Sequence, residues 1–311
     1  MKKLTVFVII LLSSLPACSQ ERKDSIAYTV DTTSLYRDLR ILSADSMAGR
    51  QTGTEGNKKA RDYIIGRFEE IGLTAYTPNY LQPFSVAPVQ RAHSAMDTVQ
   101  GVNLLGFVQG ESDSVIVLSA HYDHVGARNG DIYNGADDNA SGVAAMLAIA
   151  EYFSANKPLH TMLFAAFDAE EVGLQGAKYF MNSLEVDPDR IVLNVNMDMV
   201  SQNRKGELYA TGTRYTPSLK NYLTQADEQS PVKLKFGHDG RDGLQDWTTS
   251  SDHGPFHKKG IPFIYFGVED HPYYHKPTDT YEQVPLPFYG DATELILNSL
   301  IRLDEGLATG E

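Results

Sequence analysis

Cysteine is nearly absent from this sequence, because Cys18 is the only one among 311 residues. A single cysteine cannot form a disulfide within the chain, which excludes a disulfide-stapled scaffold. Basic residues are also scarce: 27 Lys and Arg stand against 40 Asp and Glu, giving a formal net charge of −13. A protein this acidic repels a phosphate backbone, so we expect no nucleic-acid partner.

Several catalytic signatures are missing as well. The sequence has no G-x-S-x-G nucleophile elbow, no G-x-G-x-x-G dinucleotide loop and no Gly-Lys pair to end a phosphate-binding loop. It also lacks an H-E-x-x-H zinc helix. The common forms of serine hydrolases, dinucleotide enzymes, P-loop enzymes and zincins are therefore excluded.

The N-terminus predicts an export signal. Two lysines precede an apolar run over 4–12, which is too short to span a bilayer. The tetrapeptide that ends at Cys18 resembles a lipobox, with Pro as an unusual member. We predict a lipoprotein signal peptide over 1–17, a lipid on Cys18 and a polar tether over 18–30. The mature protein would be exported and lipid-anchored to a bacterial membrane, facing the periplasm or the cell surface. An ordinary cleaved signal with an incidental cysteine is the alternative.

The remaining chain alternates strand and helix patterns. Apolar runs predict buried strands over 115–120, 161–167, 191–197 and 262–266, and apolar periodicity predicts helices over 54–72, 139–154, 174–183, 216–228 and 286–305. Such alternation is typical of an α/β fold, with a mostly parallel mixed sheet and helices on both faces. We predict a single domain over 31–311, in which the proline-containing stretch 76–100 is an irregular excursion.

Metal-capable residues follow the predicted strands or lie in nearby loops. They fall in five segments: SAHYDH over 119–124, NGADDNASG over 134–142, FDAEE over 167–171, NVNMDM over 194–199 and YYHKPTDT over 273–280. Taken singly, a lone His is usually structural, an Asp before a helix is usually a cap, and a Glu pair is usually solvated. Together they indicate one site, because ligands bind at the carboxyl ends of parallel strands.

These segments resemble the two-zinc aminopeptidases of metallopeptidase family 28. The segments LSADSMAGR over 42–50 and GTEG over 53–56 are similar to that family's opening, so the resemblance covers nearly all of the mature chain. It implies a two-zinc peptidase domain of the zinc-aminopeptidase fold, acting on peptides. The implied metal ligands are His121, Asp138, Glu171, Asp198 and His275.

The resemblance also assigns individual roles. Asp138 would bridge both metals, with His121 and Asp198 on one metal and Glu171 and His275 on the other. Three catalytic residues are implied: Glu170 as general base, Asp123 as the group that orients the imidazole of His121, and Tyr274 as the oxyanion donor that some members use. The chemistry fits these residue types, because one carboxylate can touch two cations roughly 3.5–4 Å apart.

Other residues near the motifs have less defined roles. We expect Asp252 and His253 to line the pocket or to support it without binding metal, and Asp137 and Asp279 to hold loops. His124, His257 and His271 are left without a role. Trp247, the only tryptophan, either shapes a side-chain pocket or anchors the core.

The predicted function is a zinc-dependent exopeptidase that removes N-terminal residues from peptides. A glutaminyl cyclase on the same fold is one alternative, although by resemblance such enzymes carry Ser where this chain has Asn139. A carboxypeptidase or dipeptidase of the same family is another. A non-catalytic binding module is the third, but such modules lose ligands that this chain keeps. The sequence leaves side-chain preference, native metal and oligomeric state open.

Overall fold

The computed structural model describes residues 28–86, 99–183, 185, 187–228 and 230–309. The expected signal peptide, Cys18 and most of the tether lie outside these residues, so the lipid anchor stays a prediction. The last tether residues are docked: Tyr28 donates its N–H to Asn298 Oδ1 at 3.0 Å, and its carbonyl accepts from Asn298 Nδ2 at 2.8 Å. Within the described ranges, no helix combines the length and apolar character that a membrane span requires.

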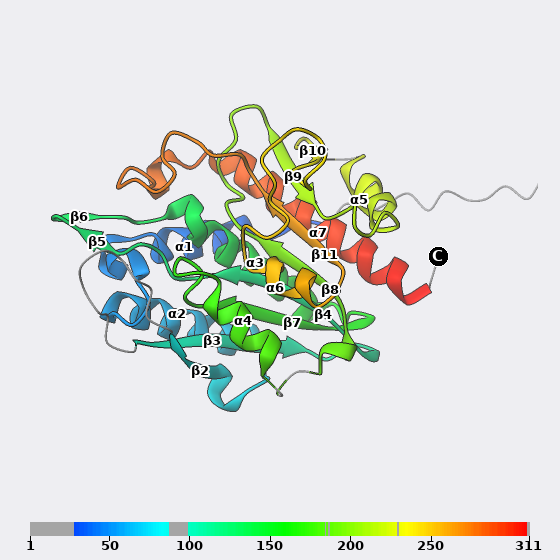
Figure 1. Ribbon diagram of the computed structural model, residues 1–311, viewed down its shortest axis with the longest axis horizontal. Helices are drawn as coiled ribbons and strands as arrows, with labels where there is room; N and C mark the ends of the chain where they lie inside the picture. The colour runs from blue at the N-terminus through cyan, green and yellow to red at the C-terminus, as the bar shows by residue number, and fades with distance from the viewer. Residues whose placement is uncertain (1–27, 87–98, 184, 186, 229, 310–311) are drawn as a thin grey trace, which may run out of the picture.

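A nine-stranded mixed sheet forms the centre of the described chain (Figure 1). Its spatial order is β1 (Thr74–Ala75), β3 (Val99–Val108), β7 (His160–Phe167), β4 (Ser112–His121), β8 (Ile191–Met197), β11 (Phe263–Gly267), β9 (Glu207–Thr211) and β10 (Lys233–Phe236), with β2 (Leu81–Val86) also paired to β3. The four consecutive strands β7, β4, β8 and β11 are parallel. Strand β3 runs antiparallel to its neighbours. A separate ribbon joins β5 (Ala127–Arg128) to β6 (Asp131–Ile132).

The parallel strands confirm the predicted sheet core. All eight residues of β7 and all five of β11 are buried. Strands covered on both faces read as continuous apolar runs, which is why the sequence revealed them. The predicted α/β class is therefore confirmed.

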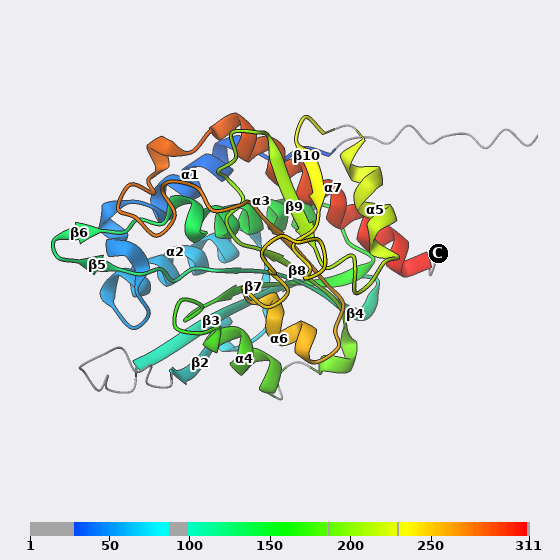
Figure 2. The same ribbon diagram turned by 45° about the horizontal axis from the view of Figure 1, so that its top comes forward.

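Helices cover both faces of this sheet (Figures 1 and 2). One face carries α1 (Thr32–Leu42), α2 (Glu55–Ile71), α3 (Gly142–Ala155), α5 (Leu219–Asp227) and α7 (Leu286–Thr309), and the other carries α4 (Gln175–Asn182) and α6 (His253–Lys258). Local chemistry sets the ends of α2. Thr54 accepts the N–H of Asn57 at the start, and Gly72 ends the helix with a φ of 83° that favours glycine.

The stretch 76–100 differs from the sequence expectation. Strand β2 lies within it and pairs along β3, with Leu81 opposite Leu104 and Val86 opposite Val99. The stretch therefore extends the main sheet, at least through Val86, instead of leaving it. Pro83 concealed this strand, because proline cannot donate to a ladder and is tolerated mainly at sheet edges.

A buried ionic network ties three helices together. Arg67 of α2 places its Nε 3.0 Å from Asp38 Oδ2 of α1, and it also contacts Glu151 of α3. Tyr63 donates its hydroxyl to Asp38 Oδ1 at 2.5 Å. The Asp38 side chain is fully buried, so its charge depends on these partners.

Asp38→Ala is expected to lower the free energy of unfolding by about 3 kcal/mol, because it leaves the Arg67 guanidinium without its most buried partner. Urea unfolding followed by circular dichroism measures the change. The control is Asp62→Ala on α2, which removes an exposed ion pair with Lys58 of that helix. It should lower the free energy of unfolding by less than about 1 kcal/mol. Equal losses in the two variants would contradict a special role for the buried pair.

Candidate metal centre

Parallel strands bring the predicted segments to one edge of the sheet. His121, at the end of β4, pairs with Phe167 at the end of β7. On its other side β4 pairs with β8, where Ser119 lies opposite Asn196. The segments that follow β7 and β8 carry Glu170 and Asp198, so the register itself gathers these groups beside His121.

Two groups of donor atoms meet at this edge. The first group combines His121, Asp138 and Asp198, and the second combines His124, Asp138, Glu171 and His275. Within each group one ligand atom per residue lies within 4.8 Å of all the others. Asp138 belongs to both groups. All five predicted ligands are therefore brought together, in the pairing that the resemblance implied.

The first group is almost entirely buried. His121 Nε2 lies 3.3 Å from Asp198 Oδ1 and 3.5 Å from Asp138 Oδ1. Burial opposes a charge on His121, yet Asp198, Glu170 and Asp138 raise its pKa well above the usual value. A divalent cation at this point would replace the proton that the carboxylates otherwise draw onto the ring.

The second group is more open at one end. His275 Nε2 lies 3.0 Å from Asp138 Oδ2 and 3.5 Å from Glu171 Oε1, while the His275 side chain is 41% exposed. Hydrogen bonds to Asp138 and Glu171 raise the pKa of His275 to about 10. Burial alone would raise the pKa of Glu171, but the neighbouring imidazoles of His124 and His275 hold it well below its usual range.

The backbone around Asp138 is held from several directions. Asp279 accepts the N–H of Asp137 at 3.0 Å and that of Asp138 at 3.1 Å. Asp137 in turn accepts from the N–H of Ser201 at 2.7 Å. Asn139 follows Asp138 across a cis peptide bond and accepts the N–H of Gly142 at 3.0 Å. The expected loop-holding contacts of Asp137 and Asp279 are thus present.

Asp123 takes a different position from the one expected. Its carboxylate accepts the N–H of Glu170 at 3.0 Å and that of Glu171 at 3.3 Å. His121 Nδ1 lies 3.1 Å from the backbone carbonyl of Asp123 but 3.7 Å from its carboxylate. The nearer partner of the imidazole is therefore the carbonyl, and the carboxylate organises the segment that carries both glutamates.

Glu170 faces a cavity of about 350 Å³ beside the donor groups. The cavity is lined by His121, Asp138, Glu170, Glu171, Gly173, Leu174, Asp198, Met199, Thr249, Ser250, Tyr274 and His275. Burial raises the pKa of Glu170 well above its usual value, and the nearby carboxylates of Asp198 and Asp252 add to the rise. A carboxyl group with a raised pKa is suited to accept and return a proton near neutral pH.

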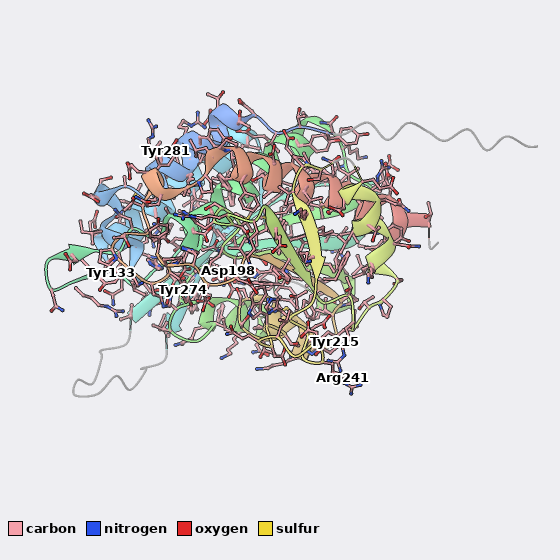
Figure 3. The ribbon with its side chains drawn as sticks, turned by 90° about the horizontal axis from the view of Figure 1, so that it is seen from above. Tyr133, Asp198, Tyr215, Arg241, Tyr274 and Tyr281 are labelled. Atoms are coloured by element: carbon pink, nitrogen blue, oxygen red, sulfur yellow. The ribbon has the colours of Figure 1, made fainter. Side chains whose placement is uncertain are left out.

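Tyr274 covers one side of the same cavity. Its ring stacks on that of His275, with centroids 4.0 Å apart and planes inclined by 22°. Figure 3 labels Tyr274 and Asp198 near each other toward the middle of the view, and both line the cavity, whereas Tyr215 and Arg241 are labelled at the lower side. A phenol at the cavity wall can donate to a substrate oxygen.

Two residues of this site receive no role from the sequence alone. His124 joins the second donor group, and its only sequence signal was its place three residues after His121. Arg50 is 1% exposed and donates to the carbonyls of Leu42, Tyr122, Asn134 and Gly135. It fixes the loop before Asp138, and no local pattern in the sequence could have shown this.

Trp247, Asp252 and His253 lie outside both donor groups. Trp247 is buried and stacks on His238, with ring centroids 3.5 Å apart, which supports the core-anchor interpretation over the pocket one. His253 donates a hydrogen bond from Nε2 to the carbonyl of Trp247 at 2.8 Å. Both carboxylate oxygens of Asp252 are buried and have no hydrogen-bond partner within the described residues.

An α/β sheet with adjoining groups of histidine and carboxylate donors at its carboxyl edge is the arrangement of a metal-binding protein of the α/β class. The profile of Peptidase family M28 matches residues 103–300, well over half of the chain. The chain belongs to this family, which confirms the resemblance found in its motifs.

Two curated relatives illustrate the match. The chain is 29% identical over 229 residues to leupeptin-inactivating enzyme 1 of Streptomyces exfoliatus, covering 72% of this chain and 45% of that protein. It is 32% identical over 192 residues to aminopeptidase YwaD of Bacillus subtilis (strain 168), covering 58% of this chain and 39% of that protein. The matched regions span less than half the length of either relative.

Solved structures share the fold at lower identity. A zinc aminopeptidase from Bacillus subtilis superposes with a TM-score of 0.71 at 18% identity, covering 88% of this chain and 95% of its own. A glutaminyl cyclase from Fimbriiglobus ruber superposes with a TM-score of 0.73 at 20% identity, covering 90% and 97%. At these identities the likeness establishes the fold alone.

Burial of His253 predicts a pH-dependent stability. Burial lowers the pKa of this histidine from 6.5 to about 4, so between these values the unfolded chain binds more protons than the folded one. Stability therefore rises with pH across this window and is lost as pH falls through it. In metal-free protein, the stability difference between wild type and His253→Gln should shrink by about 3 kcal/mol from pH 7 to pH 4.

Urea unfolding at several pH values measures this difference. Phe256→Leu, a buried substitution on the same helix, provides the control, because it should lower stability by a similar amount at every pH. A constant difference for His253→Gln as well would contradict the neutral, buried state of the imidazole.

Proposed function

We propose that this protein is a zinc-dependent aminopeptidase with two metal ions. One observation carries the proposal: two donor groups share Asp138 and adjoin the buried carboxyl group of Glu170 in one cavity. A shared carboxylate beside a proton-accepting group is the arrangement that a two-metal hydrolase needs.

The donor set fits zinc. Imidazole nitrogens and carboxylate oxygens are zinc ligands, and each group offers three or four of them. The buried oxygen Glu171 Oε1 and both nitrogens of His124 lack a hydrogen-bond partner in the described part of the chain. Unpartnered buried polar atoms are costly, so their convergence supports a bound cation. His121 and Asp198 would hold one ion, Glu171 and His275 the other, and Asp138 both.

Zinc bound in this way supplies Lewis acidity for the scissile carbonyl and for the attacking water. The chain's own residues do the rest. Glu170 accepts a proton from the water as it attacks and returns it to the leaving amine. Tyr274 donates its hydroxyl to the carbonyl oxygen as negative charge develops there. Asp123 positions Glu170 and Glu171 through their backbone N–H groups.

The cavity supports action at a chain end. Its volume of about 350 Å³ is at the small end of ligand-binding pockets, which suits a short terminal segment of a peptide. Most of its lining is polar, and Leu174, Met199 and Tyr274 form the apolar part, against which we expect an apolar terminal side chain to lie. A carboxypeptidase, a dipeptidase and a glutaminyl cyclase are the competing activities, because a related fold does not fix the reaction.

The decisive experiment follows peptides by mass spectrometry after incubation with zinc and the protein lacking residues 1–17. The mixture contains free and N-acetylated peptides that begin with Leu, Lys, Asp or Gln. We expect shortening from free N-termini only, fastest for Leu. Shortening from C-termini would replace the aminopeptidase by a carboxypeptidase, and loss of ammonia from the Gln peptide without shortening would indicate a cyclase.

Glu170→Gln should lower kcat by about 100-fold to 10,000-fold while the bound zinc content stays unchanged, because the amide cannot carry the proton. Steady-state kinetics and elemental analysis on the same sample test both parts. The control is Glu69→Gln, an exposed change on α2 that should leave both values as in wild type. Turnover retained in Glu170→Gln would sink the assignment of the base.

A further inference from the structure

His124 behaves unlike the other buried histidines of the described chain. His160 Nδ1 lies 2.8 Å from Asp304 Oδ1, His238 Nδ1 lies 2.9 Å from the carbonyl of Gln245, and His253 Nε2 lies 2.8 Å from the carbonyl of Trp247. His124 is fully buried, yet neither ring nitrogen has a hydrogen-bond partner among the described residues. A buried imidazole with a purely structural role is expected to form at least one hydrogen bond, as those three do.

The Nδ1 atom of His124 points into the donor group instead. It lies 2.7 Å from Glu171 Oε1 and 3.6 Å from Asp138 Oδ2. Glu171 Oε1 is itself buried without a hydrogen-bond partner, so the short separation is not a well-directed hydrogen bond. Two ligands of one tetrahedral zinc ion lie roughly 3.3 Å apart, so these two atoms would separate by a few tenths of an ångström around a bound cation. Their convergence without a well-directed hydrogen bond is what favours a shared cation.

The backbone is shaped to admit this ring. A Cβ at position 135 would lie 2.5 Å from His124 Cδ2 and 2.0 Å from the carbonyl oxygen of Asp138. Gly135 also has a φ of 54°, which glycine adopts without strain. The glycine thus lets the imidazole lie directly against the loop that carries the shared carboxylate.

We propose that His124 is a direct metal ligand, which gives the Glu171 and His275 site four protein donors and leaves three at the His121 and Asp198 site. The inference rests on the proposed two-metal function. Zinc takes four ligands in closed sites and keeps an open position in catalytic ones. The four-donor site therefore holds its ion more tightly, and the open position for substrate or water belongs to the three-donor site.

The first test measures zinc affinity by competition with a chromophoric chelator. Wild type should show one tight and one weaker step, and His124→Gln should weaken the tight step by more than about 100-fold. A loss of about 10-fold to 100-fold is typical of a residue that only orients a ligand, and it would overturn direct ligation. His253→Gln, a buried histidine outside both donor groups, should leave both steps unchanged.

A second measurement needs no variant and so survives a folding defect in His124→Gln. Wild-type protein with isotopically labelled histidine nitrogens is loaded with an NMR-active cadmium isotope. We expect one cadmium signal split by two histidine nitrogens and another split by one. A single nitrogen on each cadmium would refute the proposal.

Neither readout depends on peptide hydrolysis. If the protein binds metal in this unequal pattern but leaves peptides intact, the proposed aminopeptidase function fails and the ligand assignment stands. If peptides are hydrolysed while each metal carries one histidine nitrogen, the function stands and the assignment of His124 fails.

Discussion

The carboxylate of Asp138 is the point on which the rest of the site depends. It is the member common to both donor groups, so its position decides whether they form one centre or two unrelated clusters. A single side chain cannot be held there by its own packing. Asp279 therefore fixes the backbone before it, and Asn139 fixes the turn after it. Arg50 also holds this loop, because its guanidinium donates to the carbonyls of Asn134 and Gly135.

This arrangement explains why so many polar groups are buried at the carboxyl edge of an apolar sheet. Burial of a lone carboxylate costs several kcal/mol, and only pairing or a cation offsets that cost. Without a metal, the neighbouring carboxylates raise the pKa of His121 and of His275, so a proton on each ring offsets part of their charge until a cation replaces it. Burial and the nearby acids also raise the pKa of Glu170, but here the protonated form that they favour is neutral. One edge of the sheet thus separates charged ligands from a proton carrier.

Elements with a clear apolar pattern were predictable, and those without one were not. Strands β4, β7, β8 and β11 are buried on both faces and appear in the sequence as apolar runs. Strand β2 carries a proline, and β9 and β10 are short with a mixed pattern, so their pairing depends on neighbours far away in the sequence. The predicted helix over 139–154 begins instead at Gly142, because the backbone at Asp138 and Asn139 is not helical.

The sequence by itself determined the α/β class, the family and the residues that end the central strands, because apolar runs and metal-capable motifs are local patterns. It could not determine which of several histidines meet. His124 and His275 are separated by 151 positions, and their rings lie 5.8 Å apart only after the chain has folded. Likewise the backbone carbonyl of Asp123, not its carboxylate, lies nearer the His121 ring. Such choices are made by the direction of side chains in three dimensions, which residue spacing along a chain does not encode.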